Sequence, residues 1–382
     1  MKGSIAAIVC VAALLALAGP AYATNNFVWT GAAGDGRYLN GDNWNPTGPP
    51  TPDTDGSLEV WINNGDTVTV DGPGAHAGHG APGTSSKRWL YVGSSDGLGG
   101  GGDGHLVISP GGQIAGALML GCDGYTGTVI QNGIGWLCSG GDDPYTTKSI
   151  DIGCSKDGYG RFELRSGYLG QDGTKDPKEW GTGYLNIGAG YEDEGGPGEL
   201  IQYPGTRIQT RWDYRIVISG RDHGEGIYTM NGGTLRTNTF WMGGEYSNGF
   251  NAVSATWNIN STDVDIVIGA NYENPERAPG IKIGHHYANA NGPAVYINAA
   301  EGAPGETVLI TLDYGASFDN RYITPNGEDA NVAGLNNITL KFLRDHPSGT
   351  PATHIEVAGK DLGDDYHGLC NNFALEGLIV GG

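Results

Sequence analysis

Cysteines are the first residues of this 382-residue chain that could do chemistry, because a thiolate serves as a nucleophile, a metal ligand or a disulfide partner. One of the five cysteines lies in an apolar N-terminal segment, and the other four are Cys122, Cys138, Cys154 and Cys370. No Cys-x-x-Cys pair occurs, which argues against a zinc ribbon or a dithiol redox centre. In an exported chain, an even number of cysteines favours disulfides.

Two of these cysteines occupy equivalent places in a short repeated motif. Cys122 and Cys154 each follow an apolar-x-apolar-Gly unit, in the segments LMLGCDGY and IDIGCSKDGY. If successive copies stack, equivalent residues of neighbouring strands lie about 4.8 Å apart, within the Cα separation of roughly 4.4–6.8 Å that a disulfide needs. The sequence therefore predicts a Cys122–Cys154 disulfide, with paired free thiols as the alternative. Cys138 and Cys370 remain candidates for a second pair, within the chain or between subunits.

Two Gly- and Asp-rich loops, residues 93–105 and 191–199, contain the oxygen ligands that Ca²⁺ prefers. Neither loop has the spacing of an EF-hand or of the Ca²⁺-binding Gly-Gly-x-Gly-x-Asp repeat, and Asp and Gly are also the residues that tight turns favour. We therefore assign no metal-binding residue and expect no cofactor, with a weak Ca²⁺ site as the alternative. Four histidines are better explained as polar surface than as transition-metal ligands: His76, His79, His285 and His286.

The densest group of ionisable residues is SGRDHGEG, with further charges upstream in RWDYR. Acids, histidine and arginine on one loop are groups that a polysaccharide lyase or hydrolase uses for proton transfer. A solvated loop with local ion pairs, each worth at most about 1 kcal/mol, explains the same residues. We assign no catalytic residue and expect a non-enzymatic protein. The enzymatic alternative would use Arg211, Asp213, Arg215, Arg221, Asp222, His223 and Glu225.

Several tyrosines follow the apolar-x-apolar-Gly unit, where they could stack on the sugar rings of a bound glycan. In a stacked repeat, equivalent aromatic side chains also stack on one another between coils, and we favour such a ladder. These tyrosines are Tyr125, Tyr159, Tyr191, Tyr246 and Tyr272.

The elements that position all of these residues follow from the repeat itself. Each apolar-x-apolar-Gly copy is followed by a polar Gly/Asp loop, a second strand, a tight Gly turn and a short third strand. Each strand alternates apolar and polar residues, so it buries one face and needs stacked neighbours to close a core. This pattern predicts an all-β parallel β-solenoid, or β-helix, with a β-sandwich as the alternative. The copies lie at residues 90–93, 118–121, 150–153, 185–188, 216–220, 240–243, 266–269 and 281–284.

The ends of the chain differ from this repetitive centre. Residues 1–23 combine a basic start, an apolar run too short to span a bilayer and an Ala-x-Ala ending, which predicts a secretory signal peptide. Residues 24–85 predict an N-terminal cap with the first coils, residues 86–288 the solenoid, and residues 289–382 a C-terminal β cap. No later segment is apolar enough to cross a bilayer. We therefore expect a secreted, extracellular or cell-surface protein that is not integral to the membrane.

The composition of the chain limits the kinds of molecule that it is expected to bind. A formal net charge of -21 repels phosphate backbones, which argues against nucleic-acid binding. Glycine supplies 69 residues without a collagen period, and 38% of the chain is hydrophobic. A fold with many turns around an apolar core is therefore expected, rather than a disordered chain.

Three features resemble secreted bacterial β-solenoid repeat proteins: the segment VWTGAAGDGRYLNGDNW, the modules that contain apolar-x-apolar-Gly, and AGKDLG followed by NNFALEGLIVGG. That group is similar in style to autotransporter passenger domains and to surface-sorted extracellular matrix proteins. The resemblance implies secretion and a surface, adhesive or matrix role. It transfers no catalytic residue.

The function predicted from the sequence is that of an extracellular structural protein that builds a surface layer, matrix or filament by end-to-end self-assembly. Its partners would be further copies of the chain, as a homo-polymer, or other surface proteins. The segments expected to meet between subunits contain Phe27, Trp29, Phe373, Leu375, Leu378, Ile379 and Val380. A glycan-binding or adhesive module is the main alternative, and a β-helix polysaccharide lyase or hydrolase is a weaker one.

Overall fold

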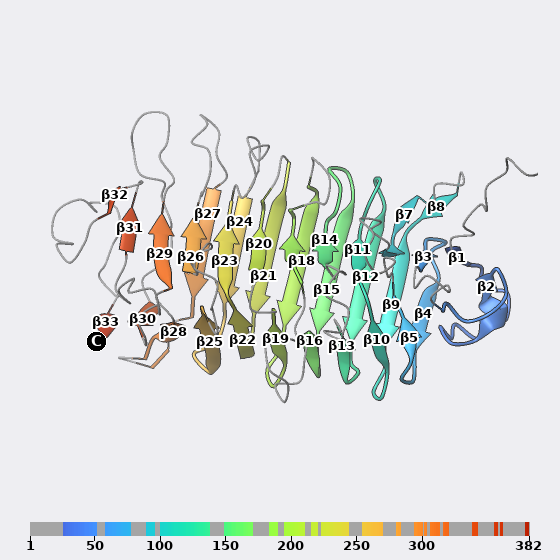
Figure 1. The fold of residues 1–382 in the computed structure, drawn as a ribbon, viewed down its shortest axis with the longest axis horizontal. Helices are drawn as coiled ribbons and strands as arrows, with labels where there is room; N and C mark the ends of the chain where they lie inside the picture. The colour runs from blue at the N-terminus through green and yellow to red at the C-terminus, as the bar shows by residue number, and fades with distance from the viewer. Residues whose placement is uncertain are drawn as a thin grey trace, which may run out of the picture.

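The chain winds into a β-solenoid whose coils stack along one long axis, as a computed structural model of the protein shows (Figure 1). The structure describes residues 26–51, 58–77, 89–95, 100–137, 149–170, 183–189, 195–210, 215–220, 223–243, 254–269, 280–283, 294–300, 302–303, 306–313, 316–320, 338–342, 355–357, 360–361 and 379–381. The predicted signal peptide, Cys138 and Cys370 lie outside these residues.

Three sheets, A, B and C, form the walls of the solenoid, and within each sheet every strand pairs with the strand named next. Sheet A comprises β2 (Trp44–Asn45), β1 (Asn26–Trp29), β3 (Glu59–Ile62), β6 (Leu90–Val92), β11 (Leu118–Leu120), β14 (Ile150–Ile152), β17 (Leu185–Ile187), β20 (Arg215–Ile218), β23 (Thr239–Met242), β26 (Gly280–Ile283), β29 (Ser317–Asn320), β31 (Ile355–Val357) and β32 (Lys360–Asp361). Sheet B comprises β27 (Ala294–Ala299), β24 (Ser254–Ile259), β21 (Glu225–Met230), β18 (Pro197–Gln202), β15 (Tyr159–Leu164), β12 (Thr126–Gln131), β9 (Gly104–Ile108) and β4 (Thr67–Val70). Sheet C comprises β33 (Ile379–Gly381), β30 (Ile338–Phe342), β28 (Val308–Leu312), β25 (Val264–Ile268), β22 (Gly233–Thr237), β19 (Arg207–Gln209), β16 (Tyr168–Gly170), β13 (Gly135–Leu137), β10 (Gln113–Ala115) and β5 (Ala75–His76). Outside these sheets, β7 (Ser94–Ser95) pairs antiparallel with β8 (Gly101–Gly102), and a 3-10 helix, η1, spans Gly41–Asn43.

One coil passes through the three sheets in turn, for example through β11, β12 and β13, before β14 begins the next coil in sheet A. Strands of successive coils pair in parallel, so Leu118 stands opposite Ile150 in sheet A and Val129 opposite Phe162 in sheet B. All four side chains are buried. The sequence-based prediction of an all-β parallel β-solenoid is confirmed, because equivalent residues of the repeat lie above one another.

Glycine follows the strands of sheet A because the backbone must turn there into the left-handed region. Gly121 ends the β11 unit with a φ of +68°. A Cβ atom added to Gly121 would also overlap the carbonyl oxygen of Tyr159, which begins the sheet B strand of the next coil. Backbone conformation and close approach therefore both require glycine at this corner.

One continuous hydrophobic core fills the solenoid. In its middle, the Trp257 ring stacks on Phe240 with the ring centroids 4.3 Å apart, and on Tyr228 at 6.2 Å. The buried Tyr228 hydroxyl donates a hydrogen bond to Gln202, whose amide donates in turn to the Thr234 carbonyl oxygen at 3.0 Å. These hydrogen bonds join neighbouring coils, whereas the indole nitrogen of Trp257 has no hydrogen-bond partner among the described residues.

Not every copy of the repeated motif forms a strand of the same sheet. The unit at residues 266–269 resembles the others, but its strand β25 belongs to sheet C and pairs with β22 and β28. Its glycine, Gly269, also has a positive φ, of +90°. The motif thus marks a strand that ends in a left-handed turn, and such a turn occurs at more than one corner of the coil.

The N-terminal end of the solenoid is overlaid by residues 36–45. Strand β2 pairs antiparallel with β1, with Asn45 opposite Val28. The Tyr38 amide donates to the Thr69 carbonyl oxygen of β4 at 2.8 Å, and the Tyr38 hydroxyl donates to the His76 carbonyl oxygen of β5. This segment therefore contacts the first coil at all three sheets. Whether it acts as a cap, as predicted for residues 24–85, stays a prediction.

The predicted boundaries near residues 85 and 289 fall inside continuous sheets. Sheet A runs from β3 to β6 across the first boundary, and from β26 to β29 across the second. At the far end, β31 pairs antiparallel with β32. No helix within the described ranges is long and apolar enough to cross a membrane.

Candidate functional site

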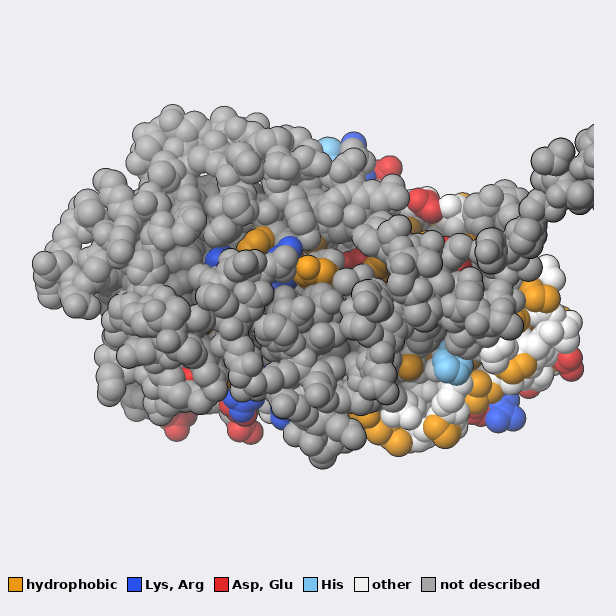
Figure 2. Space-filling model, in the orientation of Figure 1, with side chains coloured by type: hydrophobic (Ala, Val, Ile, Leu, Met, Phe, Trp, Pro, Cys, Tyr) orange, Lys and Arg blue, Asp and Glu red, His pale blue; other side chains and the backbone are white. Residues whose placement is uncertain are grey.

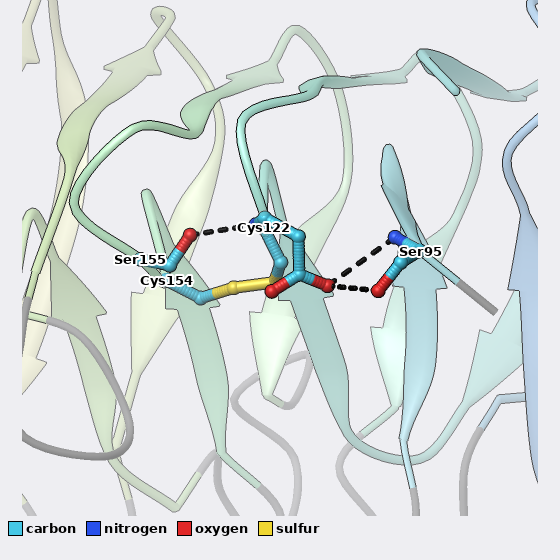
Figure 3. Close-up of a disulfide and its surroundings, with 5 residues drawn as sticks. Ser95, Cys122, Cys154 and Ser155 are labelled. Carbon is cyan, nitrogen blue, oxygen red and sulfur yellow. Dashed lines mark hydrogen bonds between the residues drawn. A yellow bond between two sulfur atoms is a disulfide. The ribbon is translucent and has the colours of Figure 1, made fainter. Parts of the chain in front are cut away.

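A disulfide between adjacent coils lies at the corner that joins sheets A and B (Figure 3). It connects Cys122, after β11, to Cys154, after β14, and the two Cα atoms are 5.2 Å apart. The predicted pairing is therefore present, and both side chains are buried. Where these two coils stack at the corner, a covalent bond joins them in place of side-chain packing.

The turn that carries the disulfide is held by hydrogen bonds to both neighbouring coils (Figure 3). Asp123 has a positive φ of 56°, which is uncommon for a residue other than glycine. Its carboxylate accepts hydrogen bonds from the hydroxyl and the amide of Ser95 in one coil. Its amide donates to the Ser155 hydroxyl of the other coil, at 2.6 Å from nitrogen to oxygen. These contacts hold the corner to the coil on each side.

The central positions on the outer face of sheet A are buried from β11 to β20, whereas period-two alternation predicts that their side chains are exposed. The central side chains of β11, β14, β17 and β20 point away from the core but are at most 9% exposed: Met119, Asp151, Asn186 and Val217. These residues stand in register on successive coils. In sheet B, by contrast, the strands β12, β21 and β24 alternate between buried and partly exposed residues as expected.

Near the N-terminus, this face is apolar. The rings of Trp61 and Tyr91 are stacked, with centroids 5.6 Å apart and planes within 7° of parallel. Tyr91 packs against a second, smaller cluster that contains Trp89, Met119 and the two disulfide cysteines. This cluster lies outside the main core, and the disulfide forms one side of it.

Farther along, the same face becomes polar and cationic. Asn186 donates a hydrogen bond from its amide to the Asp151 carboxylate in the preceding coil. The Arg215 guanidinium lies over the rings of Tyr184 and Trp241, at 4.8 Å and 4.4 Å from their centroids. The Lys282 ammonium lies 5.8 Å from the centroid of Trp241. We call Tyr184, Asn186, Arg215, Trp241 and Lys282 the cation–aromatic cluster.

The sequence did not predict this cluster. It named Arg215 only as a residue that the enzymatic alternative would use. The signal was present in the variable residue of the apolar-x-apolar-Gly unit, which in successive coils of sheet A is Tyr, Met, Asp, Asn, Val, Trp and Lys. A repeat with a freely exposed outer face would carry small or polar residues there. The mixture of apolar, aromatic and charged residues indicates a covered or functional face.

The remaining candidate residues are not brought together by the described part of the structure. His223 lies in the turn before β21, and Glu225 begins that strand, while Arg211, Asp213, Arg221 and Asp222 fall outside the described residues. Among the described residues, no group of three His, Cys, Asp or Glu side chains is arranged to hold a metal ion. The two loops considered for Ca²⁺ lie partly outside them.

The predicted tyrosine ladder is wrong for its first pair. Tyr159 stands opposite Thr126 rather than Tyr125, because the turn after Cys154 is longer than the turn after Cys122. The Tyr125 ring lies against Gly101, and the Tyr159 hydroxyl donates to Glu199 at 3.0 Å. The other three tyrosines of that prediction fall outside the described residues: Tyr191, Tyr246 and Tyr272.

The outer face of sheet B carries a network of ion pairs that is separate from the cation–aromatic cluster. Glu163 accepts hydrogen bonds from Arg161 at 3.0 Å and from Arg165 at 2.7 Å, and its side chain is only 8% exposed. Arg161 also pairs with Glu199 of the next coil. Burial raises the pKa of the Glu163 carboxyl, but the hydrogen bonds and charges of Arg165 and Arg161 outweigh burial and lower this pKa below its ordinary value of 4.5.

We expect Glu163 to make folding stability depend on acid. A lowered pKa in the folded state stabilises the protein above the unfolded-state pKa, and this contribution is lost as the pH falls through the lower folded-state value. Urea unfolding between about pH 7 and pH 3 should therefore show a smaller loss of stability on acidification for Glu163→Gln than for the natural chain. Asp265→Asn is the control, because its pair with Arg236 is exposed and should contribute little. An identical acid response of the two variants would contradict this assignment.

On the outer face of sheet A, cations, aromatic rings and an amide meet within the cation–aromatic cluster. Comparison with known proteins assigns the chain to no family: no protein-family model, no curated protein and no solved structure matches it.

Proposed function

We propose that the chain is an extracellular structural protein, a building block of a surface layer, matrix or filament. The observation that carries this proposal is the regular solenoid with a covalent bond between two of its coils. Disulfides persist in oxidising compartments outside the cytosol, and residues 1–23 have the composition of a secretory signal peptide. A rod of stacked coils extends by adding repeats, which suits a structural role.

The proposal includes a more specific likeness, to autotransporter passenger domains and to surface-sorted matrix proteins. The parallel β-solenoid fold supports it, and so do the sequence features that resemble that group. Localisation outside the cell, at the surface or in a matrix, follows from the same reasoning. Other surface proteins and glycans are the partners that such a location offers.

Self-assembly through the ends of the solenoid is the second part of the proposal. A terminal strand offers a row of backbone N–H and C=O groups to another chain. Strand β33, which contains Ile379 and Val380, is the last strand of sheet C in the described structure. We therefore place the first contact between copies of the chain at β33. Phe373, Leu375 and Leu378 lie outside the described residues, and their role stays a prediction.

The N-terminal residues named for assembly are covered. Phe27 and Trp29 are 6% and 2% exposed, and the Trp29 ring packs edge-on against Trp44 with centroids 5.0 Å apart. The outer edge of β1 is paired with β2. Head-to-tail assembly through β1 would therefore require β2 to be displaced, whereas contact between two C-terminal ends would not.

The test is a comparison of the full chain with Val380→Lys, because a lysine on an edge strand suppresses strand addition. Light scattering after size-exclusion chromatography and electron microscopy should show concentration-dependent assemblies for the natural chain and monomers for Val380→Lys. Leu309→Lys, on the exposed side of β28 in the same sheet, is the matched control and should assemble normally. A natural chain that stays monomeric at high concentration would contradict self-assembly.

A further inference from the structure

Asparagine followed by glycine is a chemically reactive pair, and the chain contains seven such pairs. The backbone amide nitrogen of the glycine can attack the side-chain carbonyl carbon of the asparagine, because glycine has no Cβ atom to hinder the approach. Four pairs lie within the described residues, at Asn40, Asn64, Asn132 and Asn231. The other three lie outside them, at Asn248, Asn291 and Asn326.

Two of the four described pairs, both near the N-terminus, have their asparagine side chains held at both ends. Asn40 donates a hydrogen bond to the Asp35 carboxylate at 2.7 Å, and its side-chain oxygen accepts one from the Asp42 amide at 3.1 Å. Asn64 donates to the Asp66 carboxylate at 2.9 Å and accepts from the Asp66 amide at 3.1 Å. Each side chain must give up these bonds before its carbonyl carbon can turn toward the following amide.

The third pair is held between coils. The side-chain oxygen of Asn231, in the turn after β21, accepts a hydrogen bond from the side-chain amide of Asn260 at 3.0 Å. Asn260 occupies the equivalent turn of the next coil, after β24. This bond directs the Asn231 side chain along the solenoid axis, so it too must break before the asparagine can react.

The fourth pair, Asn132 and Gly133 in the turn between β12 and β13, has none of these restraints. The Asn132 side chain makes no hydrogen bond to the described residues, and the Gly133 amide donates to no acceptor among them. The amides on either side are bonded: Asn132 donates to the Ile108 carbonyl oxygen at 2.7 Å, and Ile134 donates to that of Gly112 at 3.1 Å. The two groups that would react are therefore the free ones in an otherwise ordered turn.

This turn is also open to water. Asn132 is partly exposed, and the side chain of Ile134 is 52% exposed. The turns from sheet B to sheet C run along the lower edge of Figure 1, and Figure 2 shows hydrophobic and charged side chains at the surface along that edge.

We propose that Asn132 is a site of spontaneous deamidation. The Gly133 amide nitrogen forms a bond to the side-chain carbonyl carbon of Asn132, and the side-chain nitrogen leaves as ammonia with the proton of the Gly133 amide. Water then opens the five-membered imide at either of its two carbonyl carbons, which gives aspartate or isoaspartate at position 132. The sum is one water molecule taken up and one ammonia released, so the reaction needs no oxidant, cofactor or second protein.

The new carboxylate would lie next to the ion-pair network of sheet B. Gln131 stands opposite Leu164 of the next coil, so Asn132 is followed along the solenoid axis by Arg165. Arg165 pairs with Glu163, and a carboxylate at position 132 would compete for its guanidinium. Isoaspartate would in addition lengthen the backbone by one methylene group, between two amides that are hydrogen-bonded to the preceding coil.

Peptide mapping by mass spectrometry tests the proposal on the full chain. The natural protein is incubated at mildly alkaline pH, folded in buffer and unfolded in guanidinium chloride, and conversion at each Asn-Gly pair is followed over time. In the unfolded chain the four pairs should react at similar rates. In the folded chain we expect Asn132 to react fastest of the four, and the other three to slow by at least about tenfold, because one or two hydrogen bonds must first open.

Asn132→Gln should abolish the mass gain in its peptide, because glutamine would have to form a larger ring. Asn231→Gln is the matched control, since it also follows a sheet B strand, and it should leave the rate at Asn132 unchanged. Circular dichroism checks the fold of both variants. If either variant unfolds, the comparison of folded and unfolded natural chain still decides the question. Protection of Asn132 as strong as that of the other three, or a faster reaction at any of them in the folded chain, would overturn the proposal.

Discussion

Replacing Gly121 by alanine should destabilise the solenoid by about 2–5 kcal/mol. Two costs add at this position. The φ of +68° places an alanine in the left-handed region, which costs about 1–2 kcal/mol. The new Cβ would also overlap the Tyr159 carbonyl oxygen of the next coil, and relief of such an overlap typically costs a further 1–3 kcal/mol, roughly. The free energy of unfolding in urea, followed by circular dichroism, measures the sum.

Gly65→Ala separates the two costs. Gly65 has a similar φ of +82°, but a Cβ atom added there would meet nothing within 4 Å. We therefore expect only the backbone cost, about 1–2 kcal/mol. Equal destabilisation of the two variants would show that close contact between coils does not constrain Gly121, and the role given to the corner glycine would be wrong.

Removal of the Cys122–Cys154 disulfide is the second change with a large expected effect. The bond closes a loop with a sequence separation of 32 residues, for which the loss of loop-closure entropy in the unfolded chain gives about 3–4 kcal/mol of stabilisation. The double variant Cys122→Ser/Cys154→Ser should therefore unfold at a clearly lower urea concentration. Intact-mass measurement with and without reductant checks that the bond forms in the natural chain.

Ser94→Ala is the control for the disulfide variant, because Ser94 stands at the same corner of the solenoid. Ser94 lies one coil before Cys122 and is fully buried, and its hydroxyl has no hydrogen-bond partner within the described structure. Its removal should be nearly neutral or slightly stabilising. If the double cysteine variant were as stable as the natural chain, the bond would be dispensable, and packing of the coils alone would hold this corner.

These predictions and the proposed functions concern different properties of the same architecture. Corner glycines and the disulfide act on stability, and the β33 edge acts on association between chains. Each is tested by a variant that leaves the other property in place, because the residues concerned lie in separate coils and on separate sheets.

The sequence by itself determined the secondary structure and the stacking. Alternating apolar residues specify strands that bury one face, and glycine after the sheet A strands specifies a left-handed turn. Because a repeated motif places equivalent residues in adjacent coils, the Cys122–Cys154 bond was predictable from the alignment of two short segments. These features depend on local pattern and on one assumption, that neighbouring repeats stack.

Only the tertiary structure decided which outward-facing residues meet. The loops between repeats differ in length, so spacing along the chain does not show that Tyr184, Arg215, Trp241 and Lys282 stand on one face. The same variation moved Tyr159 away from the position expected from Tyr125. The pairing of strands also showed that the unit at residues 266–269 lies in sheet C. The physical reason is that register is set by backbone hydrogen bonds between coils, which hold strands in place whatever length of chain connects them.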